Sequence, residues 1–564
     1  MQLIVFPSHG GRAWHARRLR LPTYDGAMSI PDDLERARRM AFASDELGAK
    51  ELLLSLMEPI EAADRDDLML EVLAQLGELY LVRTAYDGVT EAVKRIDDCL
   101  QTYRGIRSGT RPDAQTTMSA AEIDRMICRY TRRTRFLQTG LAAAHGRHEE
   151  AAAALRQLVD DPGTVEDLAG EHAYLVTHAR ILCAAALCDD DLHVQSLPLW
   201  EKVFDALDGP ADGTEFDDTL RVLAGTGYGR FCVETGRLAE AEPWLRRAGA
   251  RAQARGWDLA TARTELERAT AAWAAGDRGR AQDLVHGAYP VIAQHARAHD
   301  VSRSWLYFGL LSISVGALDD ADERFSHAER HWREIEKPLH IHRILLQRSW
   351  VDVLRGDFTA AGDRVAEARE LLDSWPRSSW LQHARLDDHL GSILRAQALA
   401  DPAGAEEKFA RAADLKVPAA LAVDTVRHTI ADADARMRWA THVSARLLAG
   451  AFAVAWEWGN TALVSELIEY HCARGSFSVP ESPLTLDWAD TATAAVPVDD
   501  AEEYALVASG PGSVAGGGLT RLGALPPLRM DPTTAPVLAR FRELAHQRYG
   551  KAVTSTEAEW STWP

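Results

Sequence analysis

Apolar residues recur at three- and four-residue spacing along most of this chain, with polar residues between them. That spacing is typical of helices that bury one face. Alanine is abundant between about residues 30 and 475, and runs of β-branched residues are rare there. The pattern predicts an all-α chain in which helix follows helix.

A second, longer period divides this region into units. Four glycines lie 40 residues apart, and each is followed after five residues by an alanine, after nine by a large apolar residue and after twelve by a second alanine. The glycines are Gly236, Gly276, Gly316 and Gly356; the first alanines are Ala241, Ala281, Ala321 and Ala361; the large residues are Leu245, Val285, Phe325 and Val365; the second alanines are Ala248, Ala288, Ala328 and Ala368.

Each repeated residue has a physical role in a pair of antiparallel helices. Glycine lets the chain leave the first helix in a left-handed conformation. The small alanine allows the second helix to pack closely on the first, and the large residue one turn later fills the space between neighbouring pairs. Repetition over four consecutive units therefore predicts a stack of helical pairs.

One unit carries the fullest set of these residues, namely Trp305, Phe308, Gly309, Gly316, Ala321, Phe325 and Ala328. It resembles the tetratricopeptide repeat, a helix-turn-helix unit with a usual period of about 34 residues. The period of 40 implies longer helices than in that form. The resemblance implies a right-handed α-α superhelix of roughly nine pairs, over residues 28–475, whose concave groove binds a protein segment.

The two ends of the chain differ from this pattern. Residues 1–27 are predicted to be a disordered basic leader, or translation starts at Met28, directly before a good helix start at Ser29. Residues 476–564 are rich in proline and glycine and are predicted to form a partly ordered tail. Within the tail we expect a hairpin between 503–507 and 518–522 and a short helix at 536–549. The tail either folds back into the groove or presents itself to a partner.

The last third of the chain carries three short strings, at 430–434, 463–470 and 526–530, that are similar to actinobacterial repeat proteins accompanying caspase-like CHAT peptidases. No segment of this chain is expected to be such a peptidase. The resemblance implies an alternative function, a ligand-responsive regulatory subunit that controls a separately encoded effector such as a peptidase.

Composition narrows the class of partner. The formal charge is −20, which argues against a general binder of nucleic acid or of an anionic membrane. The six cysteines are too few and too scattered for a disulfide framework, and the chain has no apolar run of about 18 residues. A cytoplasmic protein is the expectation.

Motifs for catalysis are missing from the sequence. It contains no phosphate-binding G-x-x-x-x-G-K-[ST] loop, no G-x-S-x-G nucleophile turn and no H-E-x-x-H zinc helix. Cys183 and Cys188 do not form a C-x-x-C pair and are expected to be small core residues. We therefore expect a protein that is not an enzyme and has no cofactor.

One metal site has to be weighed against this expectation. His295 and His299, and likewise His327 and His331, are four residues apart, so each pair shares a helical face. His340 and His342 follow. Four converging imidazoles would bind zinc, whereas the simpler interpretation is a set of exposed histidines.

The repeat register nominates residues for the groove. When the turn glycine is counted as position 15, position 2 is Arg263, Arg303 and Arg343, with Arg133 equivalent in an earlier unit. Further candidates are Arg230 and Trp350 at position 9 and Trp273 at position 12. Arginine binds carboxylates through two parallel hydrogen bonds.

These candidates favour a non-catalytic scaffold or adaptor whose arginines hold an acidic or C-terminal carboxylate peptide. The alternative left open is that the arginines are solvated or paired within the chain, and that the two tryptophans pack in the core.

Overall fold

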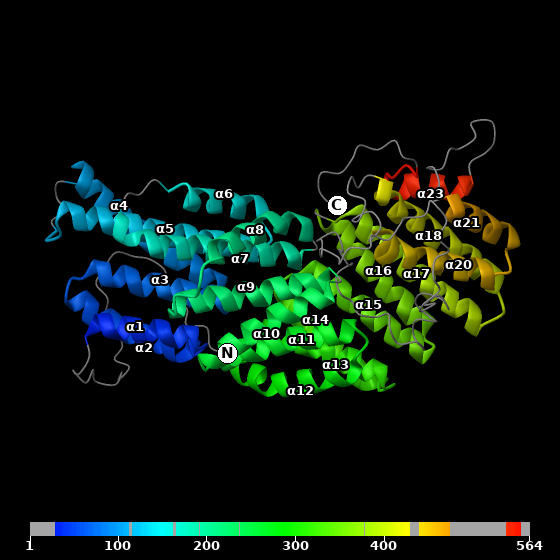
Figure 1. Cartoon of the computed structure of the whole chain (residues 1–564), viewed down its shortest axis with the longest axis horizontal. Helices are drawn as coiled ribbons and strands as arrows, with labels where there is room; N and C mark the ends of the chain where they lie inside the picture. Colours follow the sequence, from blue (N-terminus) through cyan, green and yellow to red (C-terminus); the bar gives the residue numbers. More distant parts are fainter. Residues whose placement is uncertain are drawn as a thin grey trace.

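The computed structural model describes residues 29–111, 116–161, 165–190, 192–235, 237–376, 378–428, 439–473 and 537–553. Every regular element in these ranges is helical, as predicted (Figure 1). The predicted leader and hairpin lie outside the described residues. None of the described helices is long and apolar enough to cross a bilayer.

Successive helices form pairs. The first five pairs are α1 (Ile30–Phe42) with α2 (Glu46–Ala62), α3 (Asp66–Val82) with α4 (Tyr86–Ser108), α5 (Ala120–Ala144) with α6 (His148–Val159), α7 (Ala169–Asp189) with α8 (His193–Leu207), and α9 (Glu215–Glu234) with α10 (Leu238–Ala254). The next four are α11 (Asp258–Ala274) with α12 (Arg278–His295), α13 (Ala298–Ser314) with α14 (Leu318–Glu334), α15 (Pro338–Arg355) with α16 (Phe358–Ser374), and α17 (Trp380–Ala400) with α18 (Ala405–Thr425). A further pair, α20 (Ala445–Glu457) with α21 (Thr461–Ala473), follows these nine.

The packing predicted from the 40-residue period is present. Gly276, Gly316 and Gly356 have φ of 75–80°, the left-handed turn between the two helices of a pair, whereas Gly236 is not among the described residues. The alanines and large apolar residues of the period are 0–3% exposed in all four units. The start of α1 is also as predicted, because Ser29 caps it and forms a capping box with Asp32.

A glycine in the first helix of two units permits the close approach of the second helix. A Cβ atom on Gly309 would lie 2.5 Å from the ring of Phe325, and one on Gly229 would lie 2.5 Å from Leu245. In these two units a larger residue at the glycine position would push the two helices apart. Phe325 and Leu245 therefore require the glycine on the partner helix.

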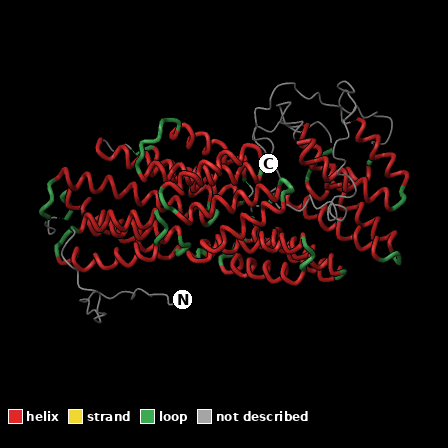
Figure 2. The backbone as a smooth tube through the Cα atoms, turned by 60° about the horizontal axis from the view of Figure 1, so that its bottom comes forward, coloured by secondary structure: helices red, strands yellow, loops and turns green. Residues whose placement is uncertain are grey.

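The array curls so that its first pair lies beside helices from the middle of the chain (Figures 1 and 2). Helix α1 contacts α9, and the ring of Phe42 lies 5.3 Å from that of Phe216. Arg297, at the start of α13, pairs with buried Glu46 of α2, and Lys337 donates to the carbonyl oxygen of Ala144 at 2.6 Å. Residues on the inner side of the curl are therefore in contact with other parts of the same chain.

The C-terminal helix α23 (Ala539–Tyr549) lies within the segment 536–549 where a helix was predicted, and it packs on α17 and α18 (Figure 1). The Tyr549 hydroxyl donates to Asp387 at 2.5 Å in a buried position. Trp439 lies in the π-helical turn η3 (Trp439–Ser444) and is 1% exposed, whereas Trp456, in the last turn of α20, is 75% exposed.

Candidate functional site

Four of the five arginines nominated from the register meet an acid of a neighbouring pair from the first helix of their own pair, namely Arg133, Arg230, Arg263 and Arg303. Arg303 of α13 binds both carboxylate oxygens of Glu267 on α11, with Nη2 to Oε2 at 2.9 Å. In the opposite direction, Arg263 of α11 lies 3.1 Å from Asp300 of α13. Two reciprocal ion pairs therefore join α11 to α13.

Arg133 is at the centre of a buried cluster of charges. Its side chain is 5% exposed and lies 2.7–3.5 Å from Glu71, Glu78 and Glu171. Burial alone would raise the pKa of Glu71, but the guanidiniums of Arg133, Arg129 and Arg38 hold it well below its usual value. For Glu78 burial is the stronger effect, so the pKa of that carboxyl is raised.

Arg230 bridges two acids at the ends of helices. It lies 2.6 Å from Asp189, at the end of α7, and its Nε donates to Glu234 at 2.7 Å. Burial would raise the pKa of Glu234, but the charges of Arg230, His193 and Arg343 together lower it to about 2. Arg343 is half-buried on α15 and belongs to the same charged interior.

The two tryptophans of the predicted groove have separate surroundings. Trp350 is 7% exposed within the main apolar core, with its ring 4.9 Å from that of His389. Trp273 is partly buried, and the guanidinium of Arg278 lies 6.0 Å from its ring centroid. Trp350 therefore packs in the core, which is one of the two alternatives that the sequence left open.

The predicted histidine set does not converge on one point. His295 Nδ1 donates to the carbonyl oxygen of Ser44 at 3.1 Å. His327 lies 3.6 Å from Glu323. His299 approaches two members of the set, with its ring centroid 6.1 Å from that of His331 and 6.2 Å from that of His340. Within the described residues these imidazoles do not form a metal site.

The acids that pair with the arginines were not predicted. In four of these pairs the acid lies 36–41 residues away in sequence, which is about one repeat. A search for opposite charges one period apart would have found them, because stacked repeats place equivalent positions side by side. These four register arginines therefore each have a counterion in the preceding or the following pair.

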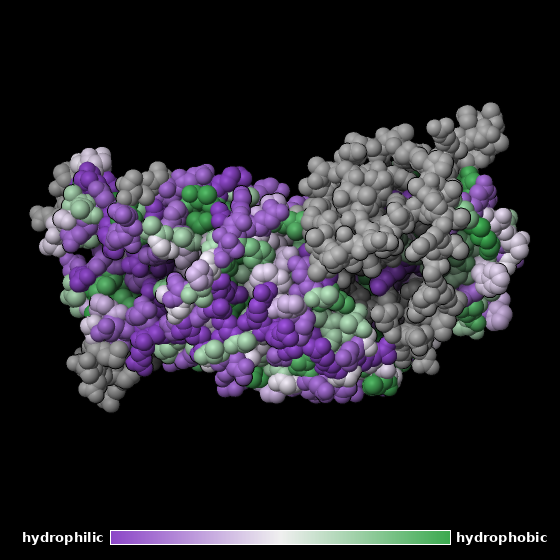
Figure 3. Space-filling model, viewed as in Figure 1, coloured by the Kyte–Doolittle hydropathy of each residue, from purple (hydrophilic) through white to green (hydrophobic). Residues whose placement is uncertain are grey.

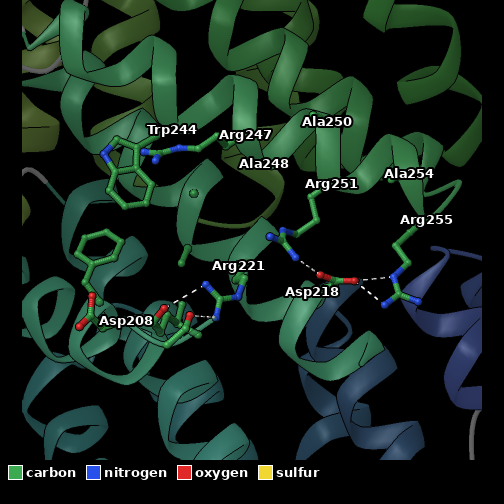
Figure 4. Close-up of a pocket in the computed structure, with 15 residues that line it drawn as sticks. Asp208, Asp218, Arg221, Trp244, Arg247, Ala248, Ala250, Arg251, Ala254 and Arg255 are labelled. Atoms are coloured by element: carbon green, nitrogen blue, oxygen red, sulfur yellow. Dashed lines mark hydrogen bonds and ion pairs between the residues drawn. The ribbon is translucent and has the colours of Figure 1, made fainter. Parts of the chain in front are cut away.

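A pocket of about 660 Å³ lies elsewhere, among α8, α9 and α10 (Figure 4). Its floor consists of small residues such as Gly225 and Ala248, and its aromatic wall is Phe204 with Trp244, whose ring centroids are 4.7 Å apart. Helix α8 ends at Leu207, at one side of the pocket. The C-terminal part of α10 extends past this helix end and lines the pocket. This size is within the usual range for ligand pockets, about 300–1,000 Å³.

Four arginines line this pocket, and three of them are engaged by the chain. Arg221 donates to the carbonyl oxygens of Leu207 and Gly209 at 2.9–3.0 Å, which caps the end of α8. Arg251 and Arg255 both bind Asp218 (Figure 4).

Arg247 differs from these three. It is exposed, its Nε donates to the carbonyl oxygen of Pro243 at 3.2 Å, and its guanidinium lies 4.5 Å from the ring centroid of Trp244 (Figure 4). Within the described part of the chain its two terminal nitrogens have no hydrogen-bond partner. Sequence reasoning missed this residue because it lies on a second helix, outside the register positions assigned to the groove.

Comparisons with known proteins do not add a family to these observations. No family model matches the chain, and no curated protein matches it in sequence. The helical-repeat architecture and the two arginine environments are therefore the basis for assigning a function.

Proposed function

We propose that this chain is a non-catalytic scaffold or adaptor that binds an acidic segment of a partner protein. The observation that carries the proposal is Arg247, a solvent-facing guanidinium with unused donors, on the wall of a pocket with an aromatic surface. A carboxylate satisfies such a fork with two parallel hydrogen bonds. A neighbouring apolar group of the partner would rest against Trp244.

The inner arginines have a different role in this proposal. Arg133, Arg230 and Arg303 hold neighbouring helices together through their acids, and this leaves the outer pocket as the recognition site. The surface in Figure 3 fits polar recognition, since hydrophilic residues cover most of the first pairs and apolar patches are small and separate.

The net charge of −20 does not oppose an acidic partner at physiological salt. Charges farther apart than about 8 Å are largely screened there, so the groups lining the pocket dominate. Four guanidiniums against two carboxylates, Asp208 and Asp218, give this lining a local positive excess.

The experiment is a selection of random displayed peptides on the full chain, followed by fluorescence polarisation with the enriched peptides. We expect them to carry carboxylates beside an aromatic or aliphatic residue. Arg247→Glu should weaken their binding by about tenfold or more, the value of a lost charged hydrogen bond. Arg246→Glu is the matched control, because Arg246 is the adjacent exposed arginine of α10 and does not line the pocket. Equal losses in both variants would contradict the proposal.

A further inference from the structure

Three side chains with metal-binding atoms meet where α7, α8 and α9 begin or end. Cys188 lies in the last turn of α7, His193 is the first residue of α8 and Glu234 is the last residue of α9. The sulfur, a ring nitrogen and a carboxylate oxygen all lie within 4.8 Å of one another. All three residues are buried, at 3–9% exposure.

The donor set is the one that zinc prefers in proteins, namely thiolate, imidazole and carboxylate. His193 Nε2 lies 3.0 Å from Glu234 Oε2, and Cys188 Sγ lies 3.5 Å from the hydroxyl of Ser196. Ligand atoms of a tetrahedral zinc ion lie about 3.3–3.7 Å apart, given bonds of about 2.0–2.3 Å. Small side-chain shifts would therefore bring the three donors around one ion.

The charges of the neighbourhood permit a divalent ion. The other oxygen of Glu234, Oε1, is held by Arg230, which in turn is paired with Asp189. A divalent ion bound to the Cys188 thiolate and the Glu234 carboxylate forms a neutral unit, so a buried net charge is avoided there, and Asp189 remains the counterion of Arg230. Burial raises the pKa of the Cys188 thiol, so the ion would have to displace the thiol proton on binding.

The preceding repeat contains a similar bridge that can be compared with this cluster. His148, the first residue of α6, lies 2.8 Å from Asp190, the C-cap of α7, so an imidazole and a carboxylate bridge two pairs there as well. Five residues before His148 the chain has Ala143, whereas five before His193 it has Cys188. The two bridges therefore differ in one metal-binding group, the Cys188 thiol, which stands where the His148–Asp190 bridge has the methyl group of Ala143.

We propose that Cys188, His193 and Glu234 bind one zinc-type divalent ion, which ties the pair α7/α8 to α9. The earlier bridge at His148 and Asp190 holds its helices by a hydrogen bond alone. The competing possibility, a hydrogen bond between His193 and Glu234 without an ion, uses the same two atoms and needs no thiolate. The two possibilities differ in whether the Cys188 thiolate binds an ion, so Cys188 is the residue to test.

The test uses the full chain without a histidine tag, stripped with chelator and titrated with Co²⁺ in a Cys472→Ser background, because Cys472 is exposed. One ion per chain should bind and produce a thiolate-to-cobalt charge-transfer band. Cys188→Ala copies the Ala143 arrangement and should remove the band and weaken binding by at least about 100-fold, more than the loss of an outer-shell contact. Cys183→Ala, at the other buried cysteine of α7, should retain the band.

Circular dichroism checks that the variants fold. X-ray absorption of the zinc-loaded Cys472→Ser chain gives a second readout that does not depend on the alanine variants, with one sulfur and otherwise nitrogen or oxygen neighbours expected. Absence of the band in the parent chain, its survival in Cys188→Ala, or a coordination shell without sulfur would each overturn the proposal. None of these readouts involves the outer pocket or peptide binding, so the proposed function is tested separately.

Discussion

Arg303 and Arg247 show how one residue type takes two roles in this array. Arg303 lies on a first helix, is 14% exposed at its side chain and binds both oxygens of Glu267. Arg247 lies on a second helix, is exposed and stacks on Trp244 with unused donors. A repeated arginine on the inner side is therefore part of the packing, and the arginine that faces solvent is available to a ligand.

The difference arises from which surfaces the curl brings together. First helices of neighbouring pairs touch, so their charges lose water and require counterions from the same chain. Second helices present one side to solvent, where a charge remains hydrated and needs no partner. The following predictions test this contrast, beginning with the largest effect.

Removing the inner guanidinium at Arg133 should cost the most stability. Arg133→Ala leaves Glu71, Glu78 and Glu171 close together without their shared cation. We expect a loss of about 3–5 kcal/mol in the free energy of unfolding, measured by urea denaturation with circular dichroism. Arg125→Ala on the same helix removes a half-exposed pair with Asp167 and should cost less than about 1 kcal/mol. Similar losses for both would contradict the inner-versus-outer contrast.

Acid should weaken the interior through His299. Burial lowers the pKa of His299 to about 4, against about 6.5 for an unfolded imidazole. As the pH falls from about 6.5 towards 4, the unfolded state binds this proton before the folded state does. Stability therefore falls by up to about 1.4 kcal/mol per pH unit in that window.

His299→Gln should reduce this slope in urea titrations at a series of pH values. His286→Gln is the control, because His286 is exposed on the outer helix α12. An unchanged slope in His299→Gln would show that His299 is not held neutral by burial.

A double-mutant cycle compares an inner and an outer ion pair of the same geometry. Glu267 and Arg303 are mostly buried, whereas Asp124 and Arg107 form a bidentate pair at 2.7–2.8 Å with both side chains 41–54% exposed. We expect a coupling free energy of about 1–3 kcal/mol for the inner pair and below about 1 kcal/mol for the outer one. Equal coupling would mean that burial does not distinguish the pairs.

The smallest expected effect is that of Arg247 on stability. Arg247→Ala should change the free energy of unfolding by less than about 0.5 kcal/mol, like Arg246→Ala beside it. Thermal and urea denaturation of both variants measure this directly. A loss above about 1 kcal/mol for Arg247 alone would assign its contact with Trp244 to the packing of α10 and not to recognition.

The sequence by itself determined the local unit. The three- and four-residue spacing of apolar residues predicted the all-α class, and the 40-residue period predicted the turn at Gly316 and the buried Ala321 and Phe325; the structure confirms each. These features depend on contacts within one pair, where residues a few positions apart must meet. Helical periodicity and the left-handed conformation of glycine fix them without reference to the rest of the chain.

Only the tertiary structure decided which distant parts of the chain meet. Glu46 contacts Arg297, about 250 residues away, because the array curls back on its first pair. The convergence of Cys188, His193 and Glu234 likewise depends on how α7, α8 and α9 end beside one another. The curl is the sum of small rotations between successive pairs, and side-chain packing across every interface sets each rotation. A repeat pattern in one dimension does not contain that sum, so it does not predict contacts between distant pairs such as that of Arg297 with Glu46.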